Sequence, residues 1–555
     1  MDDVDIRPEE WRWAGGWSLV LLALSCVPYL IAARLAPGGW QFAGFMVNPY
    51  DGHSYLAKMQ QGVGGSWLFH LTYTPEPHPG TFIFTFYLGL GRLAALTGLP
   101  LIWIFHLARL AAGFWLLLVA FRFIAQVTPH SNERRLAFIF LLTASGLGWL
   151  GASFGLFPID LWIPEAFVPY SIYANPHFPL AMALMLIIFQ QILNLETPPR
   201  LTNDHLASSS HSDNKPVSSN QKSKIKNQKS PILHPKAALA ALTLALVLPF
   251  ALLTVGAILA VYLIWLYLAY RRLPWPQIWL TLGVGAFSAP VIGYDYWIST
   301  THPILMGWAA QNVTTAPAWF DLVLGYGLLG PLAILGAWLI SRRHDRTQPG
   351  EWLVLLWAAT TVILVYLPFD LQRRLINGLH IPLCILAAIG LMRWLNQSRL
   401  QPGYRRLLTV TVIAMGALGT VLVWVLPLLG MQQPPTESVT TALFFVRQEE
   451  LVALQWLREY GDPGQVVLTS PRLGTFVPGQ TGLRAFYGHP FETIDADVKK
   501  EMAEAFYRGE RDDVAPPVDF IIYGPSERAL GQPDALADYP IVFTTDDITI
   551  YKVDR

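Results

Sequence analysis

The residues with the clearest capacity for chemistry lie in the polar stretch 48–58, directly after the first long apolar run. This stretch contains Asp51, and an aspartate just outside a membrane can serve as a general base or hold a divalent cation. Asp51 is therefore a candidate catalytic residue and a candidate ligand for magnesium or manganese. His53, Tyr55 and Lys58 are candidate substrate-binding residues beside it. An aspartate before a helix can also act only as a cap, and the sequence leaves that alternative open.

A second polar loop, 153–177, precedes another apolar run and offers two more carboxylates. Glu165 lies nearer to that run than Asp160 does, so Glu165 is the second candidate catalytic residue. Asn175 and His177 stand where a membrane helix would begin, and the N-terminus of a helix attracts anionic groups. Both are candidate substrate-binding residues. The alternative is that Asn175 only caps the helix and His177 only sits at the membrane interface.

Two adjacent arginines, Arg373 and Arg374, follow Asp370 at the end of a later apolar run. A guanidinium group can grip a phosphate with two parallel hydrogen bonds. Arg373 and Arg374 are therefore candidate ligands for a lipid phosphate, and an ordinary ion pair with Asp370 is the alternative. Nearer the end of the chain, Arg484, His489 and Glu492 are either a further site or surface residues.

The composition indicates the scaffold that must position these residues. The chain has 555 residues, of which 53% are hydrophobic and only 14% are charged. Soluble domains carry about 25% charged residues, so the deficit predicts a polytopic helical membrane protein. Its formal net charge is zero, which argues against nucleic acid as a partner.

We predict about eleven membrane-spanning helices within residues 1–430. The run 81–97 is short and interrupted by glycine, so we predict that it is a juxtamembrane or re-entrant helix of a first external loop, 37–100. The predicted spans are 17–36, 101–124, 136–152, 177–195, 237–250, 251–270, 277–296, 319–340, 351–368, 375–395 and 407–429.

Positive charge collects in five loops, which predicts that these loops and the N-terminus face the cytoplasm of the plasma (inner) membrane. The candidate site residues and everything after about residue 430 then lie outside. One of these loops, 197–236, is rich in Ser, Asn and Lys and is predicted to be disordered. The five clusters are Arg134 and Arg135; Lys215, Lys222, Lys224, Lys226, Lys229 and Lys236; Arg271 and Arg272; Arg342, Arg343 and Arg346; and Arg399, Arg405 and Arg406.

The last part of the chain, 440–555, changes character and alternates amphipathic and β-branched segments. This alternation predicts a small extracytoplasmic α/β domain. We expect helices over 445–460 and 495–508, and strands over 465–470, 518–523 and 548–553.

The chain resembles the GT-C superfamily of membrane glycosyltransferases. The resemblance rests on the acidic residue Asp51 in a long first external loop, on the helices predicted over 52–64 and 81–97 in that loop, and on an external arginine at 373 or 374. In this chain Asp51 is followed by Gly and His rather than by the second acidic residue frequent in that superfamily. The resemblance implies a glycosyltransferase that takes a sugar from a polyprenyl-phosphate donor to an extracytoplasmic glycan, lipid or protein acceptor, with membrane lipids around it.

Two other functions remain open from the sequence. The first is a transporter or flippase, although no repeat relates the two halves of the chain. The second is a non-catalytic relative that binds a lipid-linked glycan and recruits a partner through the C-terminal domain.

Overall fold

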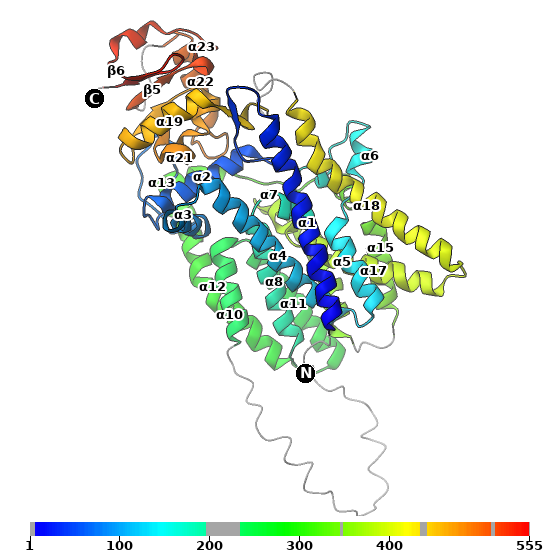
Figure 1. Ribbon diagram of the computed structural model, residues 1–555. Helices are drawn as coiled ribbons and strands as arrows, with labels where there is room; N and C mark the ends of the chain where they lie inside the picture. Colours follow the sequence, from blue (N-terminus) through cyan, green and yellow to red (C-terminus); the bar gives the residue numbers. More distant parts are fainter. Residues whose placement is uncertain (1–5, 196–233, 344–347, 433–440, 512–516, 554–555) are drawn as a thin grey trace, which may run out of the picture.

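The apolar runs of the sequence form a bundle of long helices, and the C-terminal domain covers the end of the bundle opposite the N-terminus (Figure 1). This computed structural model describes residues 6–195, 234–343, 348–432, 441–511 and 517–553. The predicted disordered segment lies outside these ranges except for its last three residues, of which His234 is the N-cap of α10 and the other two are its first helical residues, so the prediction ran too far into the helix. Each predicted span falls on one helix or on a pair of helices: α1 Pro8–Leu35, α4 Leu101–Val127, α5 Ser131–Thr143 with α6 Gly148–Ala152, α8 His177–Leu193, α10 Pro235–Val247, α11 Ala251–Tyr270, α12 Trp275–Thr301, α14 Trp319–Tyr326 with α15 Leu329–Ser341, α16 Pro349–Val365, α17 His380–Gln397 and α18 Pro402–Gly430.

Among the described residues, fewer helices than eleven meet the length and hydropathy expected of a full membrane span. Five do so: α1, α4, the α5–α6 pair, α11 and α18. A sixth is added if α14 and α15, which are bent by 86°, count as one span. The apolar helices α8, α10 and α16 are shorter. The molecule is thus a polytopic helical membrane protein with several short or broken helices.

A buried carboxylate accounts for one of these breaks. Between α5 and α6 the backbone leaves the helical conformation, and the Asp160 carboxylate accepts hydrogen bonds from the amides of Gly146 and Gly148 at 3.1 and 3.0 Å. The Ser145 hydroxyl donates to the same oxygen at 3.2 Å. These bonds satisfy amides that the broken helix would otherwise leave unpaired in an apolar setting. Asp160 therefore has a structural role.

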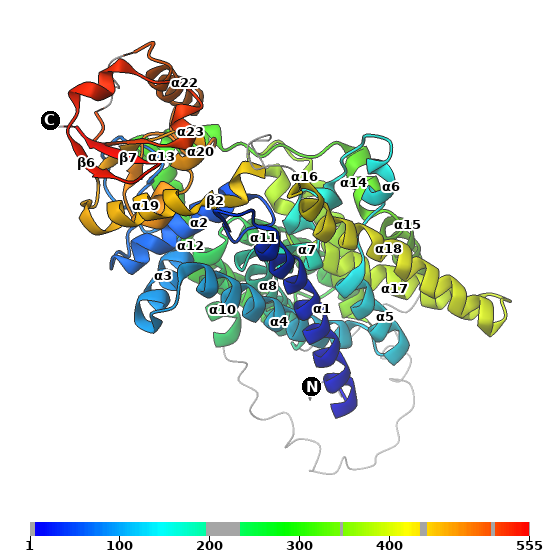
Figure 2. The same ribbon diagram turned by 45° about the horizontal axis from the view of Figure 1, so that its top comes forward.

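The helices α2 (Pro49–Val63) and α3 (Thr85–Thr97) lie beside the end of the bundle, beneath the C-terminal domain (Figures 1 and 2). With 13 residues, α3 is about 20 Å long, too short for a hydrocarbon core of about 30 Å. It exposes Leu96 to 85%, together with Leu93, and Leu99 just beyond its end is exposed as well. A short helix with an exposed apolar face is typical of the membrane interface, so the juxtamembrane position of 81–97 stays a prediction.

The two short helices cross at closely packed glycines. A Cβ atom on Gly91 would lie 1.9 Å from the Met59 carbonyl oxygen, and one on Gly62 would lie 2.1 Å from the Leu88 carbonyl oxygen. Only glycine allows the two backbones to approach this closely. This contact fixes the position of α2, which carries Asp51.

The C-terminal domain has a five-stranded mixed sheet of order β4-β3-β5-β7-β6. The strand β3 is parallel to β4 and β5, whereas β7 is antiparallel to β5 and β6. The predicted helices and strands of this domain are present, except that 445–447, predicted to open a helix, form a strand and the helix begins at Gln448. The sequence missed β4 and β6. The strands are β3 Val466–Leu468, β4 Arg484–Ala485, β5 Phe520–Tyr523, β6 Ile541–Thr544 and β7 Thr549–Lys552, and the helices are α19 Gln448–Tyr460, α20 Pro471–Gly474, α21 Val477–Thr481, α22 Ala496–Tyr507 and α23 Pro525–Arg528.

Two connections join this domain to the first loop. The strand β1 (Trp40–Phe42) follows α1 and pairs antiparallel with β2 (Phe445–Arg447), which precedes α19. The helix α21 packs on α2. The loop that leads away from α2 is also held, because the Lys499 ammonium lies 2.5 Å from a Glu76 carboxylate oxygen.

Ion pairs hold the opposite end of the bundle. Arg393 at the end of α17 pairs with Glu133 near the start of α5 at 3.1 Å and with Glu351 at the start of α16. Arg134 pairs with Glu10 of α1 at 3.1 Å. These pairs bring together helix ends that adjoin several of the predicted cytoplasmic loops.

The glycine crossing predicts that Gly91→Ala destabilises the protein by about 1–3 kcal/mol, because the new methyl group forces α2 and α3 apart. The check is a lower thermal unfolding temperature of the purified protein in detergent. Gly89→Ala is the matched control on the same helix, since its Cβ atom would meet nothing within 4 Å. Equal effects of the two substitutions would contradict the close crossing.

Candidate functional site

The Asp51 carboxylate projects from the first turn of α2. The helix begins at Pro49, three residues earlier than expected, and its N-cap is Asn48 in the left-handed region with φ 42°. The side-chain amide of Asn48 donates to the Asp51 carboxylate. Because the helix has no side-chain cap bond, Asp51 does not act as the cap that the sequence left open.

The surroundings of Asp51 make it a weaker acid than usual. Its side chain is 46% exposed, yet crowding by the neighbouring elements desolvates the carboxylate and raises the pKa of Asp51 to about 6. The negative charges of Glu492 and Glu165 also raise this pKa, whereas Lys58 and Arg374 lower it. Two carboxylates from separate regions of the chain and two cations therefore act on one half-exposed acid.

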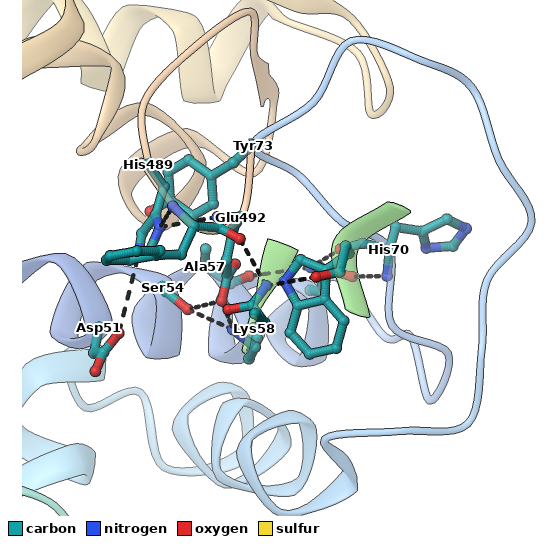
Figure 3. Close-up of polar contacts among 12 residues, drawn as sticks. Asp51, Ser54, Ala57, Lys58, His70, Tyr73, His489 and Glu492 are labelled. Carbon is teal, nitrogen blue, oxygen red and sulfur yellow. Dashed lines mark hydrogen bonds and ion pairs between the residues drawn. The ribbon is translucent and has the colours of Figure 1, made fainter. Parts of the chain in front are cut away.

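The C-terminal domain contributes directly to this site. Its Glu492 carboxylate lies 2.7 Å from the Lys58 ammonium and accepts a hydrogen bond of 2.5 Å from the Ser54 hydroxyl (Figure 3). Lys58 also donates to Ser54. The Lys58 side chain is 2% exposed and that of Glu492 is 12% exposed. Although burial alone would raise it, the pKa of Glu492 is lowered by Lys58, His489 and the hydrogen bond of Ser54.

His489 of the same loop faces Asp51. Its Nε2 atom lies 4.0 Å from an Asp51 carboxylate oxygen, and a dashed line joins the two side chains in Figure 3. His53 has a different setting, because it is buried between the rings of Phe45 and Phe476 at centroid distances of 5.2 and 4.3 Å. Burial lowers the pKa of His53 to about 3, so it is neutral where α2 meets the C-terminal domain.

Tyr55 of α2 connects the surroundings of Asp51 to Tyr87 of α3 and, through it, to His177 of α8. Its ring stacks on that of Tyr87 at 4.4 Å, and the Tyr87 hydroxyl is hydrogen-bonded to His177 Nδ1 at 2.7 Å. Burial raises the pKa of Tyr55 well above its usual value, and the charges of Asp51 and Arg374 are the next largest influences on it. The phenol therefore lies within electrostatic reach of both the acid and the arginine.

The arginine pair adjoins the loop that carries Glu165. A guanidinium nitrogen of Arg373 lies 3.9 Å from a Glu165 carboxylate oxygen, and the group covers the ring of Trp162. Arg373 thus pairs with Glu165 rather than with Asp370. Arg374 lies over Phe250 and forms no ion pair with any residue that the structure describes. Burial raises the pKa of Glu165, and the two arginines oppose this rise.

Asn175 does not cap the membrane helix that follows it. The N-cap of α8 is Pro176, and no side chain bonds to the helix end. The Asn175 side chain is buried, and its carbonyl oxygen has no hydrogen-bond partner among the described residues. An unsatisfied buried amide beside His177 is compatible with a polar ligand at this point.

The residues do not form a metal site. Within the described ranges, no three His, Cys, Asp or Glu side chains are grouped closely enough to hold a metal ion. The nearest carboxylate partner from the C-terminal domain, Glu492, is bound to Lys58. We therefore assign Asp51 no metal and derive no step that uses one.

Sequence reasoning left the role of His489 and Glu492 open, and the structure brings both to Asp51. The hydrogen bond between Ser54 and Glu492 joins residues 438 positions apart, a separation that no local pattern reveals. Arg484, considered with them, instead donates to the Glu76 carbonyl at 3.0 Å.

The fold and the site define a polytopic helical membrane protein whose polar site lies between α2, two loops at one end of the bundle and a small α/β domain. No protein-family model matches the chain, and no curated protein matches its sequence. Solved structures do match. The apo structure of ArnT from Cupriavidus metallidurans aligns over 97% of this chain and 97% of its own length, with 14% identity and a TM-score of 0.50. The chain therefore shares the overall fold of this ArnT structure.

Two further matches are weaker. ArnT of the same organism bound to undecaprenyl phosphate aligns over 97% of this chain and 98% of its own, with 13% identity and a TM-score of 0.49. The Archaeoglobus fulgidus oligosaccharyltransferase tethered to an acceptor peptide aligns over 97% of this chain and 74% of its own, with 12% identity and a TM-score of 0.48.

The raised pKa of Asp51 predicts a pH-dependent effect of Asp51→Asn on stability. The folded state binds a proton more tightly than the unfolded state, so the wild type loses stability as the pH rises from about 4 to about 6. The variant avoids this loss. At pH 8 we expect its free energy of unfolding to exceed that of the wild type by about 1 kcal/mol or less, because the group is half-exposed. The check is a higher unfolding temperature of the variant at this pH. The difference should vanish near pH 4, and a pH-independent difference would contradict the assigned pKa.

Proposed function

We propose that the protein is an inverting glycosyltransferase that moves a sugar from a polyprenyl-phosphate donor to an extracytoplasmic acceptor hydroxyl. The observation that carries the proposal is Asp51, a half-exposed carboxylate with a pKa of about 6 on which the cation of Arg374 acts. A general base works best when its pKa is near the working pH. The fold shared with ArnT supports a membrane setting for this chemistry.

In the proposed reaction, the acceptor oxygen attacks the anomeric carbon of the donor sugar. The new carbon–oxygen bond forms as the bond from that carbon to the phosphate oxygen breaks, and the phosphate leaves with the electron pair. The acceptor proton passes to Asp51. Arg374 offsets the negative charge that grows on the leaving phosphate. Arg373 holds Glu165 at the edge of the site, and Lys58 remains bound to Glu492.

The proposed orientation in the plasma (inner) membrane is supported by the distribution of positive charge. The five clusters of Lys and Arg predict a cytoplasmic N-terminus, since positive loops stay on that side. The C-terminal domain covers the opposite end of the bundle (Figure 1). The proposal therefore places Asp51 and its partners on the extracytoplasmic side, where the donor sugar and the acceptor meet.

Transfer of radiolabelled sugar in reconstituted vesicles tests the proposal, with a panel of undecaprenyl-phosphate sugars as donors and octyl glycosides as acceptors. We expect Asp51→Asn to lower kcat by about 100-fold or more, because the base is lost. Full activity of this variant would remove the role of Asp51. Movement of a solute across sealed vesicles without chemical change would favour a transporter instead.

The pH profile gives a sharper prediction. Activity should fall as the pH drops through about 6, because Asp51 takes up a proton. Glu492→Gln removes a negative charge that raises this pKa, so the acid limb should move down by about 0.5–1 pH unit. Glu76→Gln is the matched control, since Glu76 also pairs with a lysine but is not among the groups that shift the pKa of Asp51. An unshifted limb in Glu492→Gln would contradict the coupling.

The arginines predict a difference in donor recognition. Arg374→Met should raise the donor KM by about 10-fold or more, because a charge-assisted phosphate contact is lost. Arg374→Lys should give an intermediate value, since it keeps the charge without the planar fork. Arg373→Met should have the smaller effect on donor KM, because Arg373 is already paired with Glu165. A larger effect from Arg373 would reverse the assignment.

A further inference from the structure

His489 presents a fixed N–H group toward Asp51. Its Nδ1 atom accepts hydrogen bonds from the backbone amides of Phe491 and Glu492, both at 3.1 Å. A nitrogen that accepts these bonds carries no proton, so the neutral ring has its proton on Nε2. The loop of the C-terminal domain therefore sets the tautomer, and Nε2 is a hydrogen-bond donor.

This donor is buried and has no partner. The His489 side chain is 1% exposed, and Nε2 meets hydrogen-bond geometry with no described group. The Tyr50 carbonyl lies close enough to raise the pKa of the imidazole, but its position does not meet the geometry of a hydrogen bond to Nε2. An unsatisfied buried N–H group is costly, and native proteins rarely keep one without a ligand or a water molecule.

The distance across the gap fits one oxygen atom. Nε2 and the Asp51 oxygen are 4.0 Å apart, too far for a direct hydrogen bond. An oxygen placed about 2.7–3.0 Å from both atoms can accept from His489 and donate to Asp51. The rings of Tyr50 and Tyr73 lie against the imidazole at centroid distances of 5.5 and 5.4 Å and hold its orientation.

We propose that His489 of the C-terminal domain binds the acceptor, with its Nε2–H group donating to the acceptor hydroxyl oxygen while that hydroxyl donates to Asp51. This inference rests on the proposed glycosyltransferase function and deepens it, because it assigns part of the acceptor site to the C-terminal domain. The acceptor group that fits is a neutral hydroxyl, since a carboxylate would be repelled by Asp51.

The histidine orients the acceptor and takes no proton. Burial lowers the pKa of His489 to about 4, although Glu492 opposes this shift. The ring is therefore neutral at the pH where Asp51 is ionised, and the acceptor proton goes to Asp51. Orientation of this kind shifts the balance of acceptor positions toward the one that can react.

Two substitutions separate the donor group from the structural bonds of His489. His489→Asn places an amide oxygen near Nδ1, which preserves the bonds from Phe491 and Glu492, but lacks the distal N–H group. His489→Gln extends an N–H donor toward Nε2 and gives up the Nδ1 bonds. Both are measured in reconstituted vesicles with the undecaprenyl-phosphate sugar and octyl glycoside that give turnover in the wild type, beside thermal unfolding temperatures.

The inference predicts that His489→Asn is as stable as the wild type but has an acceptor KM about 10-fold higher, with an unchanged donor KM. His489→Gln should be less stable and closer to the wild type in acceptor KM. The reverse order, with His489→Gln the worse enzyme and His489→Asn normal, would show a purely structural role and overturn the inference while leaving Asp51 as the base. Absence of transfer by the wild type, or full activity of Asp51→Asn, would overturn the proposed function and the inference with it.

Discussion

The site depends on the buried ion pair between Lys58 of α2 and Glu492 of the C-terminal domain. The two residues are 434 positions apart and meet at 2.7 Å with almost no exposure to solvent. Loss of one partner would leave an uncompensated buried charge, which costs roughly 3–5 kcal/mol. The pair therefore commits α2 and the C-terminal domain to one relative position, and the backbone pairing of β1 with β2 adds to this constraint.

The same two residues also act on Asp51, whose pKa is raised mainly by burial. Glu492 brings a negative charge that favours the protonated acid, and Lys58 brings a positive charge that opposes it. Because Lys58 and Glu492 form an ion pair, their opposite effects on the pKa of Asp51 largely offset each other. Burial then dominates, and the carboxylate acquires a pKa of about 6, near the value a general base needs. The raised pKa of Asp51 lowers the stability of the folded protein at neutral pH, as is common for carboxylates at functional sites.

The sequence was sufficient for features that depend on local composition and insufficient for those that depend on distant contacts. Apolar runs located the helices, and alternating segments located the core strands of the C-terminal domain. Interruption by glycine predicted a short helix within 81–97, and α3 has 13 residues. The bend between α14 and α15 and the unwound turn beside Asp160 were not foreseen, because both depend on neighbours distant in the chain. In the site, Asp51 stood out by its position, whereas the roles of His489 and Glu492 depend on how the C-terminal domain docks.

The most direct measurement is a cryo-electron microscopy structure of the protein with undecaprenyl phosphate and an octyl glycoside bound together. The account predicts the lipid phosphate within hydrogen-bonding distance of the Arg374 guanidinium. It also predicts one acceptor hydroxyl between the Asp51 carboxylate and His489 Nε2. A phosphate bound away from Arg374, or an acceptor whose hydroxyl groups do not reach Asp51, would contradict the account.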